Sequence, residues 1–268
     1  MKKAGAKRTP HRKWVSSDSR QSTALLSQRI EERTNELRTA QAEMDAFANA
    51  ISHDLRAPLI HIGGFVDLLF NHLSSQIDEQ GRHYLKTITT STYRMGRMID
   101  DLLDFSRLNR VEMHKVPVDL DSVVRTVIDE WRPLVAKRRV VWLIGHLPVI
   151  EADPTLLRQV IAHLVSNALK FTATRDEARL HLAARRGERE IIFSIRDNGV
   201  GFDMKYQEKL FGLFQRFHSN TEFDGNGVGL AHVARIVQRH GGRTWAEGVP
   251  GGGATFYFSL PQGRTGLS

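Results

Sequence analysis

Hydrophobic residues recur every three or four positions along the first part of the chain, which is the spacing of one face of an α-helix. From residue 26 to residue 51 the intervals alternate between four and three, and Arg33 occupies the one polar slot. The apolar positions of this seam are Leu26, Ile30, Leu37, Ala40, Met44, Phe47 and Ile51. Such a heptad seam predicts a coiled coil with a second copy of the chain, although a single amphipathic helix on a globular core has a similar period. The length of the seam and the charged residues around it favour the coiled coil.

The same periodicity predicts two long helices. No glycine or proline occurs between residues 22 and 57, so the first helix is expected to run through His53 and, past Pro58, as far as Leu73. Residues 74–78 are typical of a turn, and a second helix is expected to follow to about Leu108. Two long antiparallel helices with a seam for self-pairing predict a four-helix bundle made by two chains.

After residue 115 short β-rich segments alternate with helical ones. Strands are predicted at 116–118, 140–144, 180–184, 190–196 and 254–260, and helices at 119–137, 153–171 and about 228–240. This mixture predicts a layered α/β or α+β domain. The expected organisation is a basic disordered tail (1–21), a coiled coil with the helical-hairpin domain (22–112), an α/β domain (113–262) and a short tail (263–268).

Composition narrows the class of protein. Hydrophobic residues make up 41% and charged residues 25% of the 268 residues, as in a soluble globular protein. No run of 18 apolar residues occurs and the N-terminus lacks the apolar core of a signal peptide, so a cytoplasmic location is expected. The absence of cysteine excludes disulfides and thiolate metal sites.

The net charge of +8 is concentrated at the N-terminus. Residues 1–20 contain seven Lys or Arg residues and one acid, which gives +6 and leaves +2 for the other 248 residues. A basic tail can bind nucleic acid or an anionic membrane. Because no nucleic-acid fold signature follows it, we expect a solubilising leader instead.

A candidate reactive site lies in the first helix. His53 and Asp54 interrupt the apolar pattern, and Pro58 removes the hydrogen bond that the Asp54 carbonyl would accept, so the helix is expected to kink or loosen there. A lone histidine on a helix is more often an ordinary surface residue. The pattern by itself is therefore weak evidence for catalysis.

A second candidate site lies on the helix predicted at 153–171. His163, Asn167 and Lys170 share one face of it. An amide oxygen such as that of Asn167 suits Mg²⁺, and the ammonium of Lys170 suits a phosphate. The alternative is a core helix with a polar outer face.

Glycine-rich stretches follow this helix. Residues 197–202 read Asp-Asn-Gly-Val-Gly-Phe after a predicted strand, and residues 225–231 read Gly-Asn-Gly-Val-Gly-Leu-Ala before a predicted helix, whose N-terminal amides would suit phosphate. A Rossmann fingerprint would instead follow a strand inside a compact βαβ unit. The second stretch follows a polar loop late in the domain, which argues against a Rossmann fold.

Together these motifs resemble those of sensor histidine kinases of two-component systems, close to the phytochrome type. Residues 52–59 resemble the phospho-accepting H box, 156–172 the N box, 197–202 the D box, 209–217 the F box that opens the ATP lid, and 225–231 the G box. Residues 251–258 resemble the closing hairpin. The match covers nearly the whole chain after residue 22, and the order of the motifs makes it specific.

The resemblance implies an α+β multidomain chain, with a helical-hairpin dimerisation domain followed by an α/β sandwich that binds ATP. It implies ATP- and Mg²⁺-dependent autophosphorylation of His53, with Asp54 orienting the imidazole, and transfer of the phosphoryl group to an aspartate of a response regulator. The implied nucleotide-binding residues are His163, Asn167 (also the metal ligand), Lys170, Asp197, Gly199, Gly201, Arg216, Gly225, Gly227, Gly229 and Leu230. The implied partners are a second copy of the chain, a receiver domain and an upstream sensor domain or protein; nucleic acid is not expected.

Two departures from the family pattern change the expectations. The family usually has asparagine where this chain has His163, and an imidazole is a poorer partner for Mg²⁺ than an amide oxygen. Related kinases that act as phosphatases usually carry Thr or Asn four residues after the histidine, where this chain has Ala57. A methyl group cannot position a water, so we expect weak phosphatase activity. A phosphatase or a signalling scaffold is the competing class of function.

Overall fold

The computed structural model describes residues 14–73, 77–108, 112–215, 223 and 225–262. The chain divides into two compact units, Met1–Leu55 and Arg56–Ser268. Among the described residues, no helix has both the length and the apolar character needed to cross a membrane.

Helix α1 spans Trp14–Leu73 and contains Pro58 without ending there. The predicted long first helix is therefore confirmed, but it begins within the stretch expected to be a disordered tail (1–21). Residues 14–21 are helical because Pro10 is the last glycine or proline before Pro58, and extending an existing helix costs far less than nucleating one. The rest of the predicted tail, 1–13, lies outside the described residues.

Helix α2 spans Glu79–Arg107 and confirms the second predicted helix. Its N-cap is Asp78, whose carboxylate accepts a hydrogen bond from the Gly81 backbone N–H at 2.7 Å. Such a cap satisfies one of the N–H groups that have no partner at a helix start. An ion pair between Arg56 and Asp100 links the last part of α1 to α2 within the second unit.

A five-stranded sheet forms the framework of the α/β domain. Its strand order is β2 (Arg139–Ile144), β4 (Glu177–Arg186), β5 (Glu190–Asp197), β7 (Gly253–Pro261) and β6 (Arg243–Val249). Only the β2–β4 pair is parallel, and the other pairs are antiparallel. A Rossmann fold has a mainly parallel sheet, so this topology excludes it. A separate antiparallel pair joins β1 (Val116–Asp119) to β3 (Val149–Ala152).

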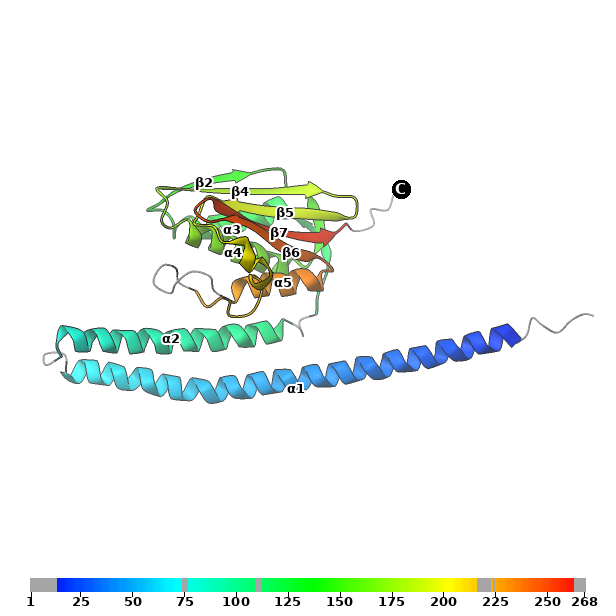
Figure 1. Cartoon of the computed structure of the whole chain (residues 1–268), viewed down its shortest axis with the longest axis horizontal. Helices are drawn as coiled ribbons and strands as arrows, with labels where there is room; N and C mark the ends of the chain where they lie inside the picture. Colours follow the sequence, from blue (N-terminus) through cyan, green and yellow to red (C-terminus); the bar gives the residue numbers. More distant parts are fainter. Residues whose placement is uncertain (1–13, 74–76, 109–111, 216–222, 224, 263–268) are drawn as a thin grey trace, which may run out of the picture. The chain divides into compact units, whose positions relative to one another are not determined.

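Three helices cover one face of this sheet, namely α3 (Leu120–Trp131), α4 (Pro154–Phe171) and α5 (Gly229–Arg239) (Figure 1). Helix α4 starts at Pro154 behind an Asp153 N-cap, which suits a proline because the first helical residue needs no N–H donor. Its apolar face packs on inward residues of the strands, and Val160, Ile161, Leu164 and Val165 are each at most 2% exposed. The helical hairpin and the α/β domain have the predicted fold class.

Several predicted bounds differ from the structure. Helix α3 ends at Trp131 and not at residue 137, because Pro133 has no N–H to donate to the carbonyl four residues before it. Strands β3 and β6 and the short 3₁₀ helix Met204–Lys209 were not predicted. Strand β3 is only four residues long and β6 has a single buried side chain, so neither makes a strong strand pattern in the sequence.

Candidate functional site

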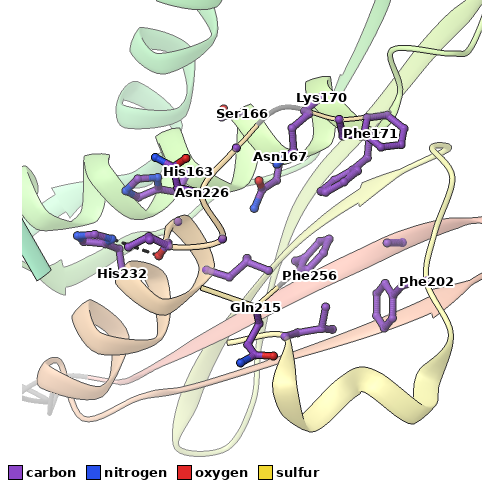
Figure 2. A pocket seen from close by; sticks show the side chains of 18 of the residues that line it. His163, Ser166, Asn167, Lys170, Phe171, Phe202, Gln215, Asn226, His232 and Phe256 are labelled. Atoms are coloured by element: carbon purple, nitrogen blue, oxygen red, sulfur yellow. Dashed lines mark hydrogen bonds between the residues drawn. The ribbon is translucent and has the colours of Figure 1, made fainter. Parts of the chain in front are cut away.

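A cavity of about 400 Å³ lies beside α4, at the ends of β5 and β7 and at the start of α5 (Figure 2). All three residues predicted on one face of α4 line it: His163, Asn167 and Lys170. Asp197, Gly201, Gly225, Gly227, Gly229 and Leu230 also line it. The structure therefore brings together predicted residues from three separate motifs.

Asp197 is the last residue of β5 and lies in the apolar part of the cavity. It is 3% exposed, and its Oδ1 accepts a hydrogen bond from the Gly199 N–H at 2.8 Å. Its buried Oδ2 has no hydrogen-bond partner among the described residues. Burial raises the pKa of Asp197 to about 6, against the opposing effect of the nearby backbone N–H groups of Gly199 and Ala254. A buried carboxylate oxygen without a partner is costly unless a ligand supplies a donor.

The glycines after Asp197 allow the backbone to pack closely. A Cβ at Gly199 would lie 2.5 Å from the Phe171 carbonyl oxygen, and a Cβ at Gly201 would overlap the Val249 carbonyl. Gly201 also has a φ of 63°, in the left-handed region that favours glycine. The spacing of this motif therefore has a steric cause that is visible in the fold.

The glycines before α5 serve the opposite, polar end of the cavity. A Cβ at Gly227 would lie 2.6 Å from the Gln215 carbonyl oxygen, and one at Gly225 would lie 3.1 Å from Lys170 Nζ. Helix α5 begins at Gly229 without a side-chain cap, so its first N–H groups are available to a ligand. The partial positive charge of a helix N-terminus and the nearby Lys170 ammonium both suit a phosphate.

His163 lies against the start of α5 and stacks on His232, with ring centroids 5.4 Å apart (Figure 2). A Cβ at Gly229 would lie 3.2 Å from His163 Nδ1. Burial, and then the neighbouring His232, lower the pKa of His163 to about 4, while Asp101 opposes the shift. The imidazole is consequently neutral at physiological pH. His232 itself donates from Nδ1 to the Val228 carbonyl at 3.2 Å.

Asn167 projects into the middle of the cavity between these two ends (Figure 2). Among the described residues, no cluster of three or more His, Asp or Glu side chains could hold a metal ion. The donor set fits a Mg²⁺ ion that takes one amide oxygen from the protein and its other ligands from phosphates and water. A site for a metal held by protein groups alone does not fit.

Sequence reasoning missed several cavity residues. Phe202 and Phe256 supply aromatic walls at the end nearer Asp197, and Asn226 and His232 supply polar groups at the other end. Asn226 donates to the Asp101 carboxylate of α2 at 2.8 Å. Phe202, Asn226 and Phe256 stand within the motifs at 197–202, 225–231 and 251–258, so their positions were usable signals, whereas Asp101 lies outside every motif. The predicted Arg216 lies outside the described residues.

The other predicted site, around His53, is on α1. The side chain of His53 is 86% exposed, and its Nδ1 lies 3.3 Å from Asp54 Oδ1. A carboxylate oxygen accepts, so a hydrogen bond in this pair is donated by Nδ1. His53 and Asp54 thus lie in contact, and their roles at the site stay a prediction.

Two protein families match the chain. The family described as "His Kinase A (phospho-acceptor) domain" matches residues 43–110, and the family described as "Histidine kinase-, DNA gyrase B-, and HSP90-like ATPase" matches residues 152–264. His53 and Asp54 fall in the first match, and every predicted nucleotide-binding residue falls in the second. The chain belongs to the histidine kinases, as the motifs predicted.

Individual relatives agree with this assignment. Cyanobacterial phytochrome A of Nostoc sp. is 32% identical over 229 residues, which are 85% of this chain and 30% of the phytochrome. The crystal structure of full-length ShkA in complex with AMPPNP is similar with a TM-score of 0.57 and 30% identity, over 80% of this chain and 45% of ShkA. The crystal structure of ThkA in complex with the response regulator TrrA is similar with a TM-score of 0.56, over 81% of this chain and 61% of ThkA. Its sequence identity is 23%, so this similarity bears on the fold alone. The chain thus spans about a third of the length of such a phytochrome.

Proposed function

We propose that this chain is a kinase module that transfers the γ-phosphoryl group of ATP to His53 and then to an aspartate of a response regulator. One observation carries the proposal: a single cavity has a buried, unpartnered carboxylate oxygen of Asp197 at one end and the uncapped start of α5 with Lys170 at the other. An adenine amine and a triphosphate are complementary to these two ends.

On the base side, the exocyclic amine of adenine would donate to Asp197 Oδ2 while Phe202 and Phe256 contact the ring. On the phosphate side, Lys170 and the amides of Gly227, Gly229 and Leu230 would hold the triphosphate. Gly225 leaves room for the lysine side chain. Arg216, as the sequence suggests, would add a positive charge from the lid.

Asn167 would hold Mg²⁺ together with the phosphate oxygens. Bound there, the ion would neutralise charge on the β- and γ-phosphates. His163 would lie next to the phosphates as a neutral group, consistent with its lowered pKa.

At the acceptor, Nε2 of His53 would attack the γ-phosphorus in line. The N–P bond forms as the bond from phosphorus to the β–γ bridging oxygen breaks, and ADP leaves with that electron pair. Asp54 would hold the Nδ1 proton during attack and receive it afterwards, which leaves an uncharged imidazole ring bearing the anionic phosphoryl group. The exposure of His53 supports its access to a separate catalytic domain and to a receiver domain.

The partners of this activity are also proposals. A response regulator is supported by the phospho-acceptor family match. A homodimer is supported by exposed apolar side chains of α1, such as Phe65 at 71% and Leu69 at 45%. An upstream sensor is supported by the chain's correspondence to only 30% of a phytochrome.

Incubation of the purified chain with γ-³²P-ATP and Mg²⁺ tests the proposal. The expected product is a label that is lost in acid and retained in alkali, as for a phosphoramidate. His53→Gln should abolish the label and leave ATP binding unchanged. His61→Gln is the matched control, because His61 is another exposed histidine on α1 and should label normally. Label that persists in His53→Gln would refute the acceptor assignment.

A further inference from the structure

Arg175 makes an unusual set of contacts beside the cavity, which no sequence motif predicted. Its Nε donates to the Asn198 carbonyl at 2.8 Å, and its Nη2 donates to the carbonyls of Gly199 at 2.9 Å and Gly251 at 2.7 Å. Among the described residues, no ion pair includes Arg175. Its guanidinium is therefore committed to backbone oxygens and not to a carboxylate.

These bonds lead directly to Asp197. The carbonyl of Asn198 and the N–H of Gly199 belong to the same peptide unit. Arg175 donates to the oxygen of that peptide unit, and the N–H of the same unit, which belongs to Gly199, donates to Asp197 Oδ1 at 2.8 Å. A hydrogen bond at one end of a peptide group fixes its plane and strengthens the bond at the other end. The orientation of the Asp197 carboxylate thus depends on Arg175.

The third bond joins two turns. Gly251 lies in the turn between β6 and β7, and its N–H donates to the Val200 carbonyl at 2.7 Å. By also binding the Gly251 carbonyl, Arg175 ties this turn to residues 198–200. A guanidinium presents several donors in a fixed fork, whereas a lysine ammonium is a point charge on a flexible stem. The arrangement requires arginine.

We propose that Arg175 is a positioning residue for base recognition: it fixes the 198–199 peptide so that Asp197 Oδ1 is occupied and Oδ2 faces the purine 6-position. This proposal rests on the function proposed above and extends it to base specificity. The consequence is selectivity for a 6-amino purine over a 6-oxo purine, whose oxygen would face a carboxylate oxygen.

The test compares the dissociation constants of ATP and inosine triphosphate, which differ at that position. In Arg175→Ala we expect ATP affinity to fall roughly ten-fold, the range for losing hydrogen bonds to a charged group. Affinity for inosine triphosphate should change little, so the preference for ATP shrinks. Arg175→Lys should give an intermediate loss. Arg179→Ala is the control, because the exposed Arg179 side chain pairs with Glu177 and its backbone bond to Asn198 is retained.

A double-mutant cycle with Asp197→Asn separates positioning from general loosening. If Arg175 acts through Asp197, Arg175→Ala should weaken ATP binding less than three-fold in the Asp197→Asn background. Equal losses for both nucleotides, or additive effects in the cycle, would overturn the inference and assign Arg175 a merely structural role. A wild-type chain that binds neither nucleotide would instead refute the proposed function itself.

Discussion

At the scale of single residues, Asp197 makes the nucleotide site sensitive to pH. Its pKa of about 6 lies above the ordinary value of 3.8 because the carboxyl is buried. The ionised form therefore costs folding stability above pH 6, and this cost disappears as the group is protonated at lower pH. An adenine amine requires the ionised acceptor, so nucleotide binding and protonation compete for the same oxygen.

We therefore expect ATP affinity to be constant above about pH 7 and to fall as the pH drops below about 6, by at most about ten-fold per pH unit. Isothermal titration calorimetry across this pH range measures the affinity for ATP at each pH. Asp197→Asn is the control, since it cannot ionise; any dependence that remains comes from the nucleotide or other groups. Equal pH profiles for the two proteins would contradict the role of Asp197.

Sequence reasoning was strongest at this scale for residues that stand in motifs. His163, Asn167, Lys170 and Asp197, which come from two motifs, all line one cavity. The unpartnered Oδ2 of Asp197 was beyond prediction, because it depends on which of its oxygens the Gly199 N–H reaches. Arg175 was missed for a similar reason: its role exists only once three carbonyls distant in sequence converge on it.

At the scale of elements, the turn after β5 depends on Gly201. Gly201→Ala places a methyl group on the Val249 carbonyl of β6 and forces a left-handed φ on an alanine. We expect a loss of roughly 2–4 kcal/mol in the free energy of unfolding, from overpacking and backbone strain. Thermal unfolding measures this loss of stability. A nucleotide titration of the same variant should show that ATP binding is lost as well.

Gly96→Ala provides a matched control on α2, where a Cβ would meet nothing within 4 Å. Alanine is favoured over glycine inside a helix by up to about 1 kcal/mol, so this variant should be neutral or slightly more stable. If Gly201→Ala unfolds at the same temperature as the wild type, the close packing of the turn against β6 is not what requires glycine.

Elements were predictable where periodicity was strong and poorly predictable where it was weak. The apolar seam of α1 and the apolar face of α4 both recur at helical spacing, so both helices were predicted. Strand β6 was missed because its pattern includes Gly248 and exposes Arg243 and Glu247, so little marks it as apolar. It is stabilised by antiparallel pairing with β7, which is a property of the folded sheet.

At the scale of the whole molecule, the cavity combines parts of the chain that lie far apart in sequence. The polar face of α4, the end of β5, residues 225–230 and Ala254 and Phe256 of β7 meet only because β5 and β7 pair with Asp197 opposite Ala254. The register of a sheet cannot be read from one strand. The resemblance to a known family predicted that these segments form one site, whereas the residue patterns alone predicted only the separate helices, strands and motifs.

Self-association is the last property to test, because exposed apolar residues of α1 require a partner surface. Ile62, Phe65 and Leu69 recur at intervals of three and four and are 43%, 71% and 45% exposed. A charge in the interior of a four-helix bundle would be strongly unfavourable. We expect the wild-type chain to sediment as a dimer and Phe65→Glu to sediment as a monomer at the same micromolar concentration. Leu134→Glu is the control, because Leu134 is equally exposed at 74% but lies in the α/β domain, and it should remain dimeric. A dimer that persists in Phe65→Glu would place the interface elsewhere and remove the reason for the exposed seam.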